Sequence, residues 1–234
     1  MTYIKMMILG RSGSGKTTSL RNLDPKQTGI INADKESFPF PSNGFRTIKD
    51  AKGLPDLSKS NYVETGKPSS MLKCLKTWDE RQDIKTIVVD TITHLFTEYY
   101  VTQALGKDYG GYKEMGTSFW DVMDNINKLN TNVIVFGHIQ YTFNDMGDKV
   151  ISMKSHGKMI ESFEPESYFN TLLLAEVIKE EGTLKWVFRT KPKETFEKIK
   201  SPSTFIGDKV VSVLDYYEDN DINAILNKLN KFYS

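Results

Sequence analysis

One short loop near the start of the chain constrains the fold more than any other feature. Residues 6 to 23 read MMILGRSGSGKTTSLRNL: an apolar run ends at Gly10, small residues follow to Gly15, and Lys16 and Thr17 open a stretch with helical spacing. The spacing G-x-x-x-x-G-K-[ST] requires a strand, a tight loop and a helix in that order. Glycines let consecutive backbone N–H groups turn inward as an anion-binding nest. The sequence therefore predicts a buried strand whose carboxyl end carries an anion-binding loop.

This pattern is that of the phosphate-binding P-loop, and its ligand is predicted to be ATP with Mg²⁺. The amino end of the following helix adds partial positive charge facing the phosphates. Lys16 can reach the β- and γ-phosphates, and the hydroxyl of Thr17 can bind the metal ion. The predicted nucleotide-binding residues are Gly10, Arg11, Ser12, Gly13, Ser14, Gly15, Lys16, Thr17 and Thr18.

A second acid is expected to complete the metal site. TIVVD (86–90) is a β-branched run suited to a strand buried on both faces, and it ends at Asp90. A carboxylate at that strand end can orient Mg²⁺ together with Thr17. An alternative role for Asp90 is to cap the helix that is expected to begin at Ile92.

The alternation of strand and helix patterns predicts an α/β fold with a mostly parallel central sheet flanked by helices. Antiparallel strands are expected near the C-terminus, because two apolar runs between 168 and 191 are joined at Glu181-Gly182. The chain is expected to form a single domain over 1–234. Expected strands are 2–9, 28–34, 84–90 and 132–140; expected helices are 17–23, 67–80, 92–105, 118–130 and 221–233; glycine-rich or polar loops are expected at 106–116 and 142–158.

Composition excludes several functional classes. With 38% hydrophobic and 26% charged residues the chain is typical of globular proteins, and its net charge of +1 excludes a globally basic nucleic-acid coat. The single Cys74 excludes an internal disulfide and fits a reducing compartment, so the cytoplasm is the expected location. No apolar run is long enough to span a membrane.

Beyond the P-loop, the chain resembles the RecA-like recombinase ATPases, and most closely the core-only members that phages carry as single-strand DNA annealing proteins. The resemblance spans most of residues 3–215. Where the family has a catalytic acid in a context like IDAE, this chain has INAD (31–34), which nominates Asp34, with Glu36 as the alternative. Where the family has a polar sensor of the γ-phosphate in a context like FINQIR, VFGHIQ places His138. The resemblance thus implies a RecA-like P-loop core with DNA-dependent ATP hydrolysis.

The same resemblance implies an oligomer. The family pattern VKNK, whose basic residues reach the nucleotide of a neighbouring subunit, is similar to FRTK (188–191), which nominates Arg189 and Lys191. A ring or filament of identical subunits with ATP at their interfaces is the expected assembly. The P-loop strand begins almost at once, without a preceding oligomerisation domain, as in the core-only branch.

Single-stranded DNA is the expected partner, because RecA-like cores bind it with two loops after the third and fourth strands. Two segments stand in comparable places and interleave aromatic with basic residues, the sequence-tolerant way of binding single strands. A single-strand DNA-binding protein is a further possible partner, and no membrane is expected. The nominated DNA-binding residues are Lys107, Tyr109, Tyr112 and Lys113 in the first segment and Lys149, Lys154 and Lys158 in the second.

Two other functions stay open on sequence grounds. A P-loop kinase for a nucleotide or metabolite would need several arginines to clamp two phosphorylated ligands, and this chain has five scattered ones. A non-hydrolysing, ATP-gated DNA-binding accessory factor would tolerate Asp34 in place of the longer acid. A GTP switch is disfavoured, because NKLN (127–130 and 227–230) lacks the acid of the guanine-reading pattern N-K-x-D.

Overall fold

The computed structural model describes residues 2–99, 109–143, 146–155, 164–194 and 197–234. Its helices are η1 (Thr17–Asn22), α1 (Pro68–Asp79), α2 (Ile92–Tyr99), α3 (Tyr109–Lys128), η3 (Pro165–Tyr168) and α5 (Ile222–Tyr233). Its strands are β1 (Lys5–Gly10), β2 (Thr28–Asn32), β3 (Tyr62–Glu64), β4 (Thr86–Asp90), β5 (Asn132–Phe143), β6 (Lys149–Met153), β7 (Thr171–Glu180), β8 (Thr183–Arg189), β9 (Ser203–Ile206), β10 (Lys209–Ser212) and β11 (Tyr217–Asp219).

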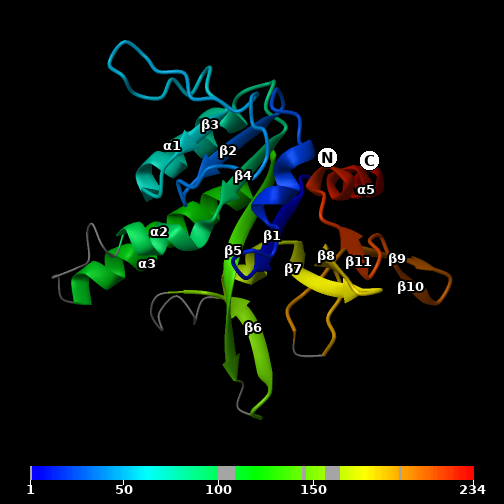
Figure 1. The fold of residues 1–234 in the computed structure, drawn as a ribbon. Coiled ribbons are helices and arrows are strands. Elements are labelled where there is room, and N and C mark those ends of the chain that lie inside the picture. Colours follow the sequence, from blue (N-terminus) through cyan, green and yellow to red (C-terminus); the bar gives the residue numbers. More distant parts are fainter. Residues whose placement is uncertain (1, 100–108, 144–145, 156–163, 195–196) are drawn as a thin grey trace.

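A central sheet organises this part of the chain (Figure 1). Its strands follow the order β11-β8-β7-β1-β5-β4-β2-β3, with β6 paired to β5. The pairs from β7 through β3 are parallel, and the pairs β7–β8, β8–β11 and β5–β6 are antiparallel. The α/β fold class is therefore confirmed, with a mostly parallel sheet and antiparallel strands near the C-terminus.

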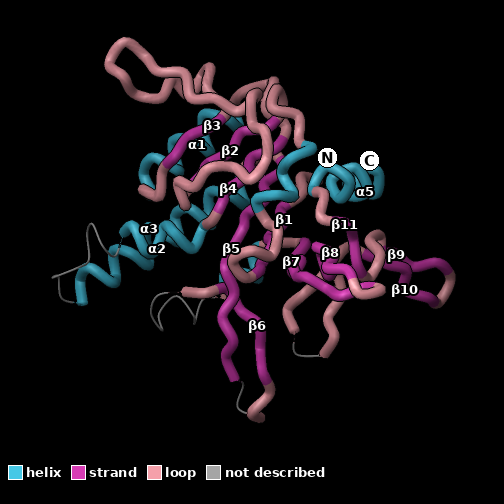
Figure 2. The backbone as a smooth tube through the Cα atoms, viewed as in Figure 1, coloured by secondary structure: helices cyan, strands magenta, loops and turns pink. Residues whose placement is uncertain are grey.

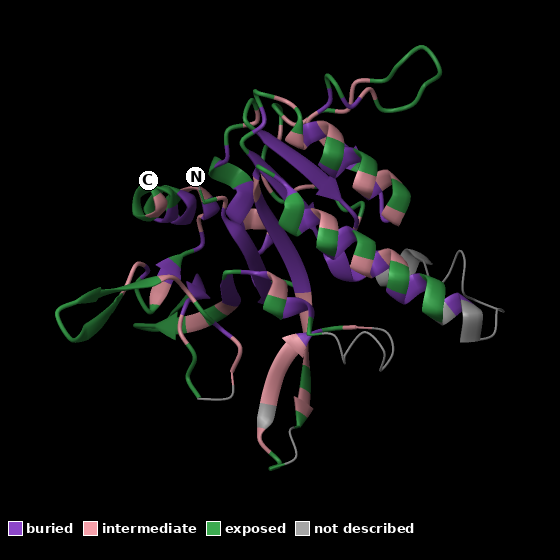
Figure 3. Cartoon of the chain, turned by 180° about the vertical axis from the view of Figure 1, so that it is seen from behind, coloured by how far each residue is buried: buried purple, intermediate pink, exposed green. Residues whose placement is uncertain are grey.

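Two apolar cores cover the two faces of the sheet. In β1 the side chains alternate: Met7 and Leu9 join the core formed with α1 and α3, whereas Met6 and Ile8 join the core formed with η1 and α5. Figure 3 shows the central strands buried behind α1 and α3. Because both faces are covered, the strands read as continuous apolar runs, as parallel strands do.

Two expected loops are regular structure instead. The segment predicted as a glycine-rich loop at 106–116 lies in α3 from Tyr109 onward. Part of the predicted polar loop at 142–158 is a β-hairpin, because β5 continues to Phe143 and pairs with β6. Figure 2 shows the β5–β6 hairpin and the separate β9–β10 hairpin both extending away from the main body.

The helix after the P-loop is a short 3-10 helix, η1, where a helix over 17–23 was expected. The strand pair around Glu181-Gly182 and the C-terminal helix agree with the prediction. Among the described residues, no helix is long and apolar enough to cross a bilayer.

Candidate functional site

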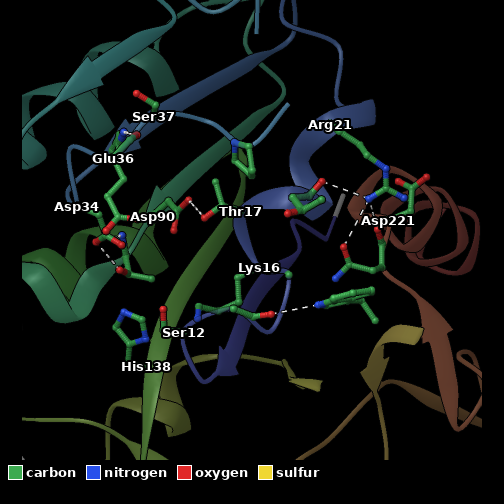
Figure 4. A pocket seen from close by; sticks show the side chains of 18 of the residues that line it. Ser12, Lys16, Thr17, Arg21, Asp34, Glu36, Ser37, Asp90, His138 and Asp221 are labelled. Carbon is green, nitrogen blue, oxygen red and sulfur yellow. Dashed lines mark hydrogen bonds between the residues drawn. The ribbon is translucent and has the colours of Figure 1, made fainter. Parts of the chain in front are cut away.

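The ends of four parallel strands meet at one edge of the sheet. The strand register places Gly10 beside His138 and Asn32 beside Asp90. A pocket of about 890 Å³ lies there. Figure 4 shows Asp34, Asp90 and His138 on one side of Lys16, with Arg21 and Asp221 at the far end.

The P-loop wraps the base of this pocket. Gly13 and Gly15 have φ of +76° and +87°, which side-chain-bearing residues rarely adopt. A Cβ at Gly10 would lie 2.4 Å from the hydroxyl of Ser14, so the first glycine allows the tight turn. Of the predicted nucleotide-binding residues, Ser12, Gly13, Gly15, Lys16, Thr17 and Thr18 line the pocket, while Gly10, Arg11 and Ser14 are not part of its wall.

Lys16 lies folded across the loop. Its Nζ donates to the carbonyl oxygens of Gly10 and Arg11, 3.0 Å from each, and the residue is buried. Burial lowers the pKa of Lys16, although the carboxylates of Asp90 and Asp34 oppose the shift. An anion in the loop would replace these carbonyl contacts with a partner of opposite charge.

Thr17 and Asp90 form the pair expected of a Mg²⁺ site. The Thr17 hydroxyl donates to Oδ2 of Asp90 at 2.8 Å. The other oxygen, Oδ1, is buried without a hydrogen-bond partner among the described residues. Burial raises the pKa of Asp90 to about 7, and the nearby acids Asp34 and Glu36 add to the rise, while Thr17 and Lys16 oppose it. A buried carboxylate with an unused oxygen beside a hydroxyl fits a hydrated divalent cation.

Asp34 is fixed by neighbours at the start of α2. Its Oδ1 accepts hydrogen bonds from the backbone N–H and the hydroxyl of Thr91, and Nε2 of His94 lies 3.5 Å from the same oxygen. Glu36 also lines the pocket, but its side chain is exposed. Both candidate acids therefore reach the pocket, and Asp34 is the one held in place.

His138 faces Asp34 and His94. Ligand atoms of these three side chains lie within 4.8 Å of one another, and the two imidazole rings are 6.0 Å apart. Burial and, secondarily, the charge of Lys16 lower the pKa of His138, so the neutral imidazole is favoured. Such a set can hold a water molecule by hydrogen bonds or bind a metal ion.

Arg189 does not occupy the place expected of a residue that reaches a neighbouring subunit. Only 1% of it is exposed, and its guanidinium forms two hydrogen bonds with Glu197 and lies 3.3 Å from Glu176. Its charge is already paired inside the subunit in this structure, so contact with a neighbouring nucleotide would require these ion pairs to open, and the role of Arg189 stays a prediction. Lys191 is half-buried, and its role stays a prediction.

Most of the nominated DNA-binding residues lie in a helix or a strand, or outside the residues that the structure describes. Lys107 and Lys158 lie outside the described residues. Tyr109, Tyr112 and Lys113 are in helix α3, and Lys149 is in strand β6, so the expected loop location is corrected for all four. Lys154 follows β6 directly and is exposed.

Three residues that line or border the pocket escaped the sequence analysis. His94 lies in the first turn of α2, and only the fold brings it to Asp34. Trp186 on β8 and Asn220 before α5 line the far end of the pocket. Nothing in the local sequence distinguishes Trp186 or Asn220, because they reach the pocket only through the pairing of β8 with β7 and β11.

Comparisons with known proteins identify a family for most of the chain. The family model described as "AAA domain" matches residues 2–198. Among solved structures, a KaiC-like protein from the hyperthermophilic archaeon Pyrococcus horikoshii OT3 is similar at 13% identity, with 89% of this chain and 88% of that chain covered and a TM-score of 0.44. No curated protein matches the chain. Because the family model spans most of the sequence and includes the P-loop, Asp34, Asp90 and His138, the chain belongs to the AAA-domain family.

Proposed function

We propose that this chain is an ATPase of RecA-like type that binds single-stranded DNA and promotes its annealing or recombination, as in phage DNA metabolism. The observation that carries the ATPase assignment is the hydrogen bond between Thr17 and Asp90, which joins the P-loop to a buried strand end inside the pocket. The family match supports nucleotide binding and hydrolysis in general.

The phosphate end of the pocket supplies charge and a metal site. Lys16 leaves the carbonyl oxygens of the loop and pairs with the β- and γ-phosphates. Thr17, with its hydroxyl, and Asp90, with its carboxylate, would hold a metal ion at this end of the pocket. Mg²⁺, when bound, neutralises charge that develops on the phosphates during transfer to water.

The hydrolytic acid in this proposal is Asp34. Its carboxylate is oriented by Thr91 and lies beside His94, so it can accept a hydrogen bond from an attacking water without first losing side-chain freedom. His138, held neutral, can donate from one ring nitrogen to a phosphate oxygen and respond to its departure. Glu36 is the alternative acid, and its exposed side chain would have to be ordered by the ligand.

Support for DNA binding comes from the β5–β6 hairpin. Phe143 on this hairpin is 72% exposed, which suits stacking against a base. Arg11 of the P-loop donates to the hydroxyl of Tyr141 at 3.1 Å and lies over its ring, 5.1 Å from the centroid. The hairpin and the P-loop are thus in direct contact, so nucleotide occupancy and DNA binding can be coupled.

The proposal includes a homo-oligomer with ATP near subunit interfaces, in which Lys191 of one subunit approaches the nucleotide of the next. The kinase alternative has less support. Arg21 is the one arginine in the pocket lining, and it is bonded to Asn220 within the chain. An arginine clamp for a second phosphorylated substrate is therefore not formed by the described residues.

The test is ATP turnover with and without single-stranded DNA, measured as phosphate release. Wild type should be stimulated by DNA, Lys16→Ala should lose turnover by at least roughly a hundredfold, and Asp34→Ala should lose it far more than Glu36→Ala. Lys26→Ala, an exposed lysine outside the pocket, is the matched control. Absence of turnover together with absence of DNA retention at low salt would refute the proposal, and ATP-gated DNA binding without turnover would favour the accessory-factor alternative.

A further inference from the structure

The pocket has a second end that phosphate chemistry does not use. Beyond the P-loop, its wall is formed by β8 and by the junction between β11 and α5, including Leu184, Trp186, Asn220 and Ala224. We propose that Trp186 and Asn220 form a nucleobase subsite that stacks on and hydrogen-bonds a purine, with a preference for adenine. This inference rests on the proposed function in one respect: it requires a nucleoside triphosphate in the P-loop.

Trp186 presents an apolar ring to the pocket. Along β8 the side chains alternate, so that Leu184 and Trp186 lie on the same side as Phe188; Phe188 is buried in the core with α5, whereas the other two end in the pocket wall. Trp186 is 45% exposed, and its indole N–H donates to the carbonyl oxygen of Gly13 at 3.1 Å. That bond fixes the ring beside the P-loop. A flat heteroaromatic base would cover the exposed ring by stacking.

Asn220 supplies an unsatisfied donor at the same place. The residue is 7% exposed, and its Nδ2 is buried without a hydrogen-bond partner among the residues the structure describes. Arg21 donates to its backbone oxygen and approaches its Oδ1 at 3.5 Å, which leaves Nδ2 turned to the other side. A buried N–H without an acceptor is costly, so a ligand acceptor there would bind favourably.

Both groups converge on one glycine of the P-loop. A Cβ added to Gly15 would lie 2.9 Å from Nδ2 of Asn220 and 2.9 Å from Cδ1 of Trp186. The indole and the carboxamide therefore lie directly against the loop. The base of a nucleotide whose phosphates are bound in the loop can reach both groups. Residues separated by more than 170 positions in sequence are combined into one binding surface.

The carboxamide favours adenine. It offers a donor and an acceptor side by side, which matches the N6 amine and N7 of adenine, whereas the same edge of guanine presents two acceptors. The neighbouring acids that could read guanine N–H groups are already engaged. Asp221 accepts from two backbone amides at the start of α5, and Asp219 lies 3.4 Å from Lys185.

The experiment compares three ligands by equilibrium titration: ATP, GTP and inorganic tripolyphosphate, each with Mg²⁺. Wild type is expected to bind ATP at least roughly tenfold more tightly than tripolyphosphate, with GTP weaker than ATP. Trp186→Ala should weaken ATP binding by about ten- to a hundredfold, the range of an aromatic–base stack, and leave tripolyphosphate binding within about twofold. Asn220→Ala should weaken ATP binding and narrow the difference between ATP and GTP.

Matched control variants distinguish a general loss of side-chain packing from a loss of nucleobase binding. Trp120→Phe changes a partly buried tryptophan that packs against Tyr168 outside the pocket, and it should leave all three affinities unchanged. Trp186→Phe keeps an aromatic face and should retain most ATP affinity. If Trp186→Ala does not fold, Trp186→Leu and Asn220→Gln carry the test, since the first keeps an apolar side chain without a ring to stack and the second keeps the amide but displaces it by one methylene; both should weaken ATP binding.

The outcomes distinguish this inference from the proposed function. If wild type binds tripolyphosphate as tightly as ATP, and the Trp186 and Asn220 variants bind ATP like wild type, the nucleobase subsite is refuted while the P-loop assignment stands. Equal binding of ATP and GTP refutes the adenine preference. If no triphosphate binds at all, the proposed function and the subsite fall together.

Discussion

At the scale of single residues, the P-loop combines strained backbone, a buried lysine and a hydroxyl within eight positions, from Gly10 to Thr17. Glycine at positive φ, a lysine and a threonine at fixed spacing identify the P-loop because few alternatives satisfy the backbone and the anion together. Asp90 followed from the same logic, and it lies bonded to Thr17. Arg189 shows the limit of this reasoning: a motif gives residue type, but only the structure reveals that Glu197 has already neutralised the charge.

Lys5 gives a prediction at this scale. Its Nζ donates to the carbonyl oxygens of Leu129 and Thr131, and burial lowers its pKa to about 8, with Asp79 opposing the shift. Between pH 8 and 10.5 the unfolded chain keeps a proton that the folded chain has released, so the free energy of unfolding should rise with pH. Burial of the charged Lys5 amine destabilises the folded state in full below pH 8. This destabilisation is lost above pH 10.5, where the free energy of unfolding should be higher by up to about 3 kcal/mol.

Urea unfolding of wild type and Lys5→Met at pH 7.5 and pH 10 measures this effect. Other groups titrate in both proteins, so the effect of Lys5 is read from the difference between their free energies of unfolding at each pH. A difference that stays constant between the two pH values would contradict the assignment.

At the scale of elements, strongly periodic and continuous apolar segments were predicted well, and glycine-rich ones were not. The strand at Thr86–Asp90 and the helix at Ile222–Tyr233 have unambiguous patterns. The stretch from Tyr109 was expected to be a loop because of Gly110 and Gly111, yet it is helical, because packing of Met115 and Phe119 into the core outweighs the local preference of glycine. A short stretch of sequence does not reveal tertiary contacts of this kind.

The buried arginine of β8 gives a prediction for that element. Arg189→Ala should lower the free energy of unfolding by about 3 kcal/mol, because it removes a buried guanidinium and leaves the half-buried Glu197 without its main partner. Lys191→Ala, two residues further on and half-buried, should change it by less than about 1 kcal/mol.

Chemical denaturation of both variants, paired with ATP turnover, checks this assignment. Loss of turnover in Arg189→Ala with unchanged stability would instead restore a role for Arg189 at a neighbouring nucleotide.

At the scale of the whole molecule, the sequence predicted the fold class but not the order of the strands in the sheet. Alternating strand and helix patterns imply a mostly parallel sheet, but the strand order, which sets Gly10 beside His138, depends on pairings far apart in sequence. The pocket is therefore lined by residues from β8 and the β11–α5 junction, and bordered by one from α2, that no local motif indicates. His94, Trp186 and Asn220 belong to this group.

Two projecting hairpins allow a matched test of where DNA binds. Phe143 on the β5–β6 hairpin and Phe205 on the β9–β10 hairpin are exposed by 72% and 73%. Phe143→Ala should weaken single-stranded DNA binding by roughly five- to a hundredfold through lost stacking, whereas Phe205→Ala should leave it unchanged. Lys154→Ala should reduce the slope of log affinity against log salt by about 1.

Fluorescence anisotropy of a labelled oligonucleotide at several salt concentrations measures both effects. Equal losses from the two phenylalanine variants would place the DNA elsewhere.

Strand β5 runs without interruption from the core, past His138 at the pocket, to Phe143 on the hairpin, and its hydrogen-bond ladder passes from β1 and β4 to β6. The five steps from His138 to Phe143 span about 17 Å at the usual rise per residue of an extended chain. A tilt of about 10° at the imidazole would therefore swing the aromatic tip by about 3 Å. The length of β5 therefore sets how far the hairpin tip would move for a given tilt of the strand at the pocket.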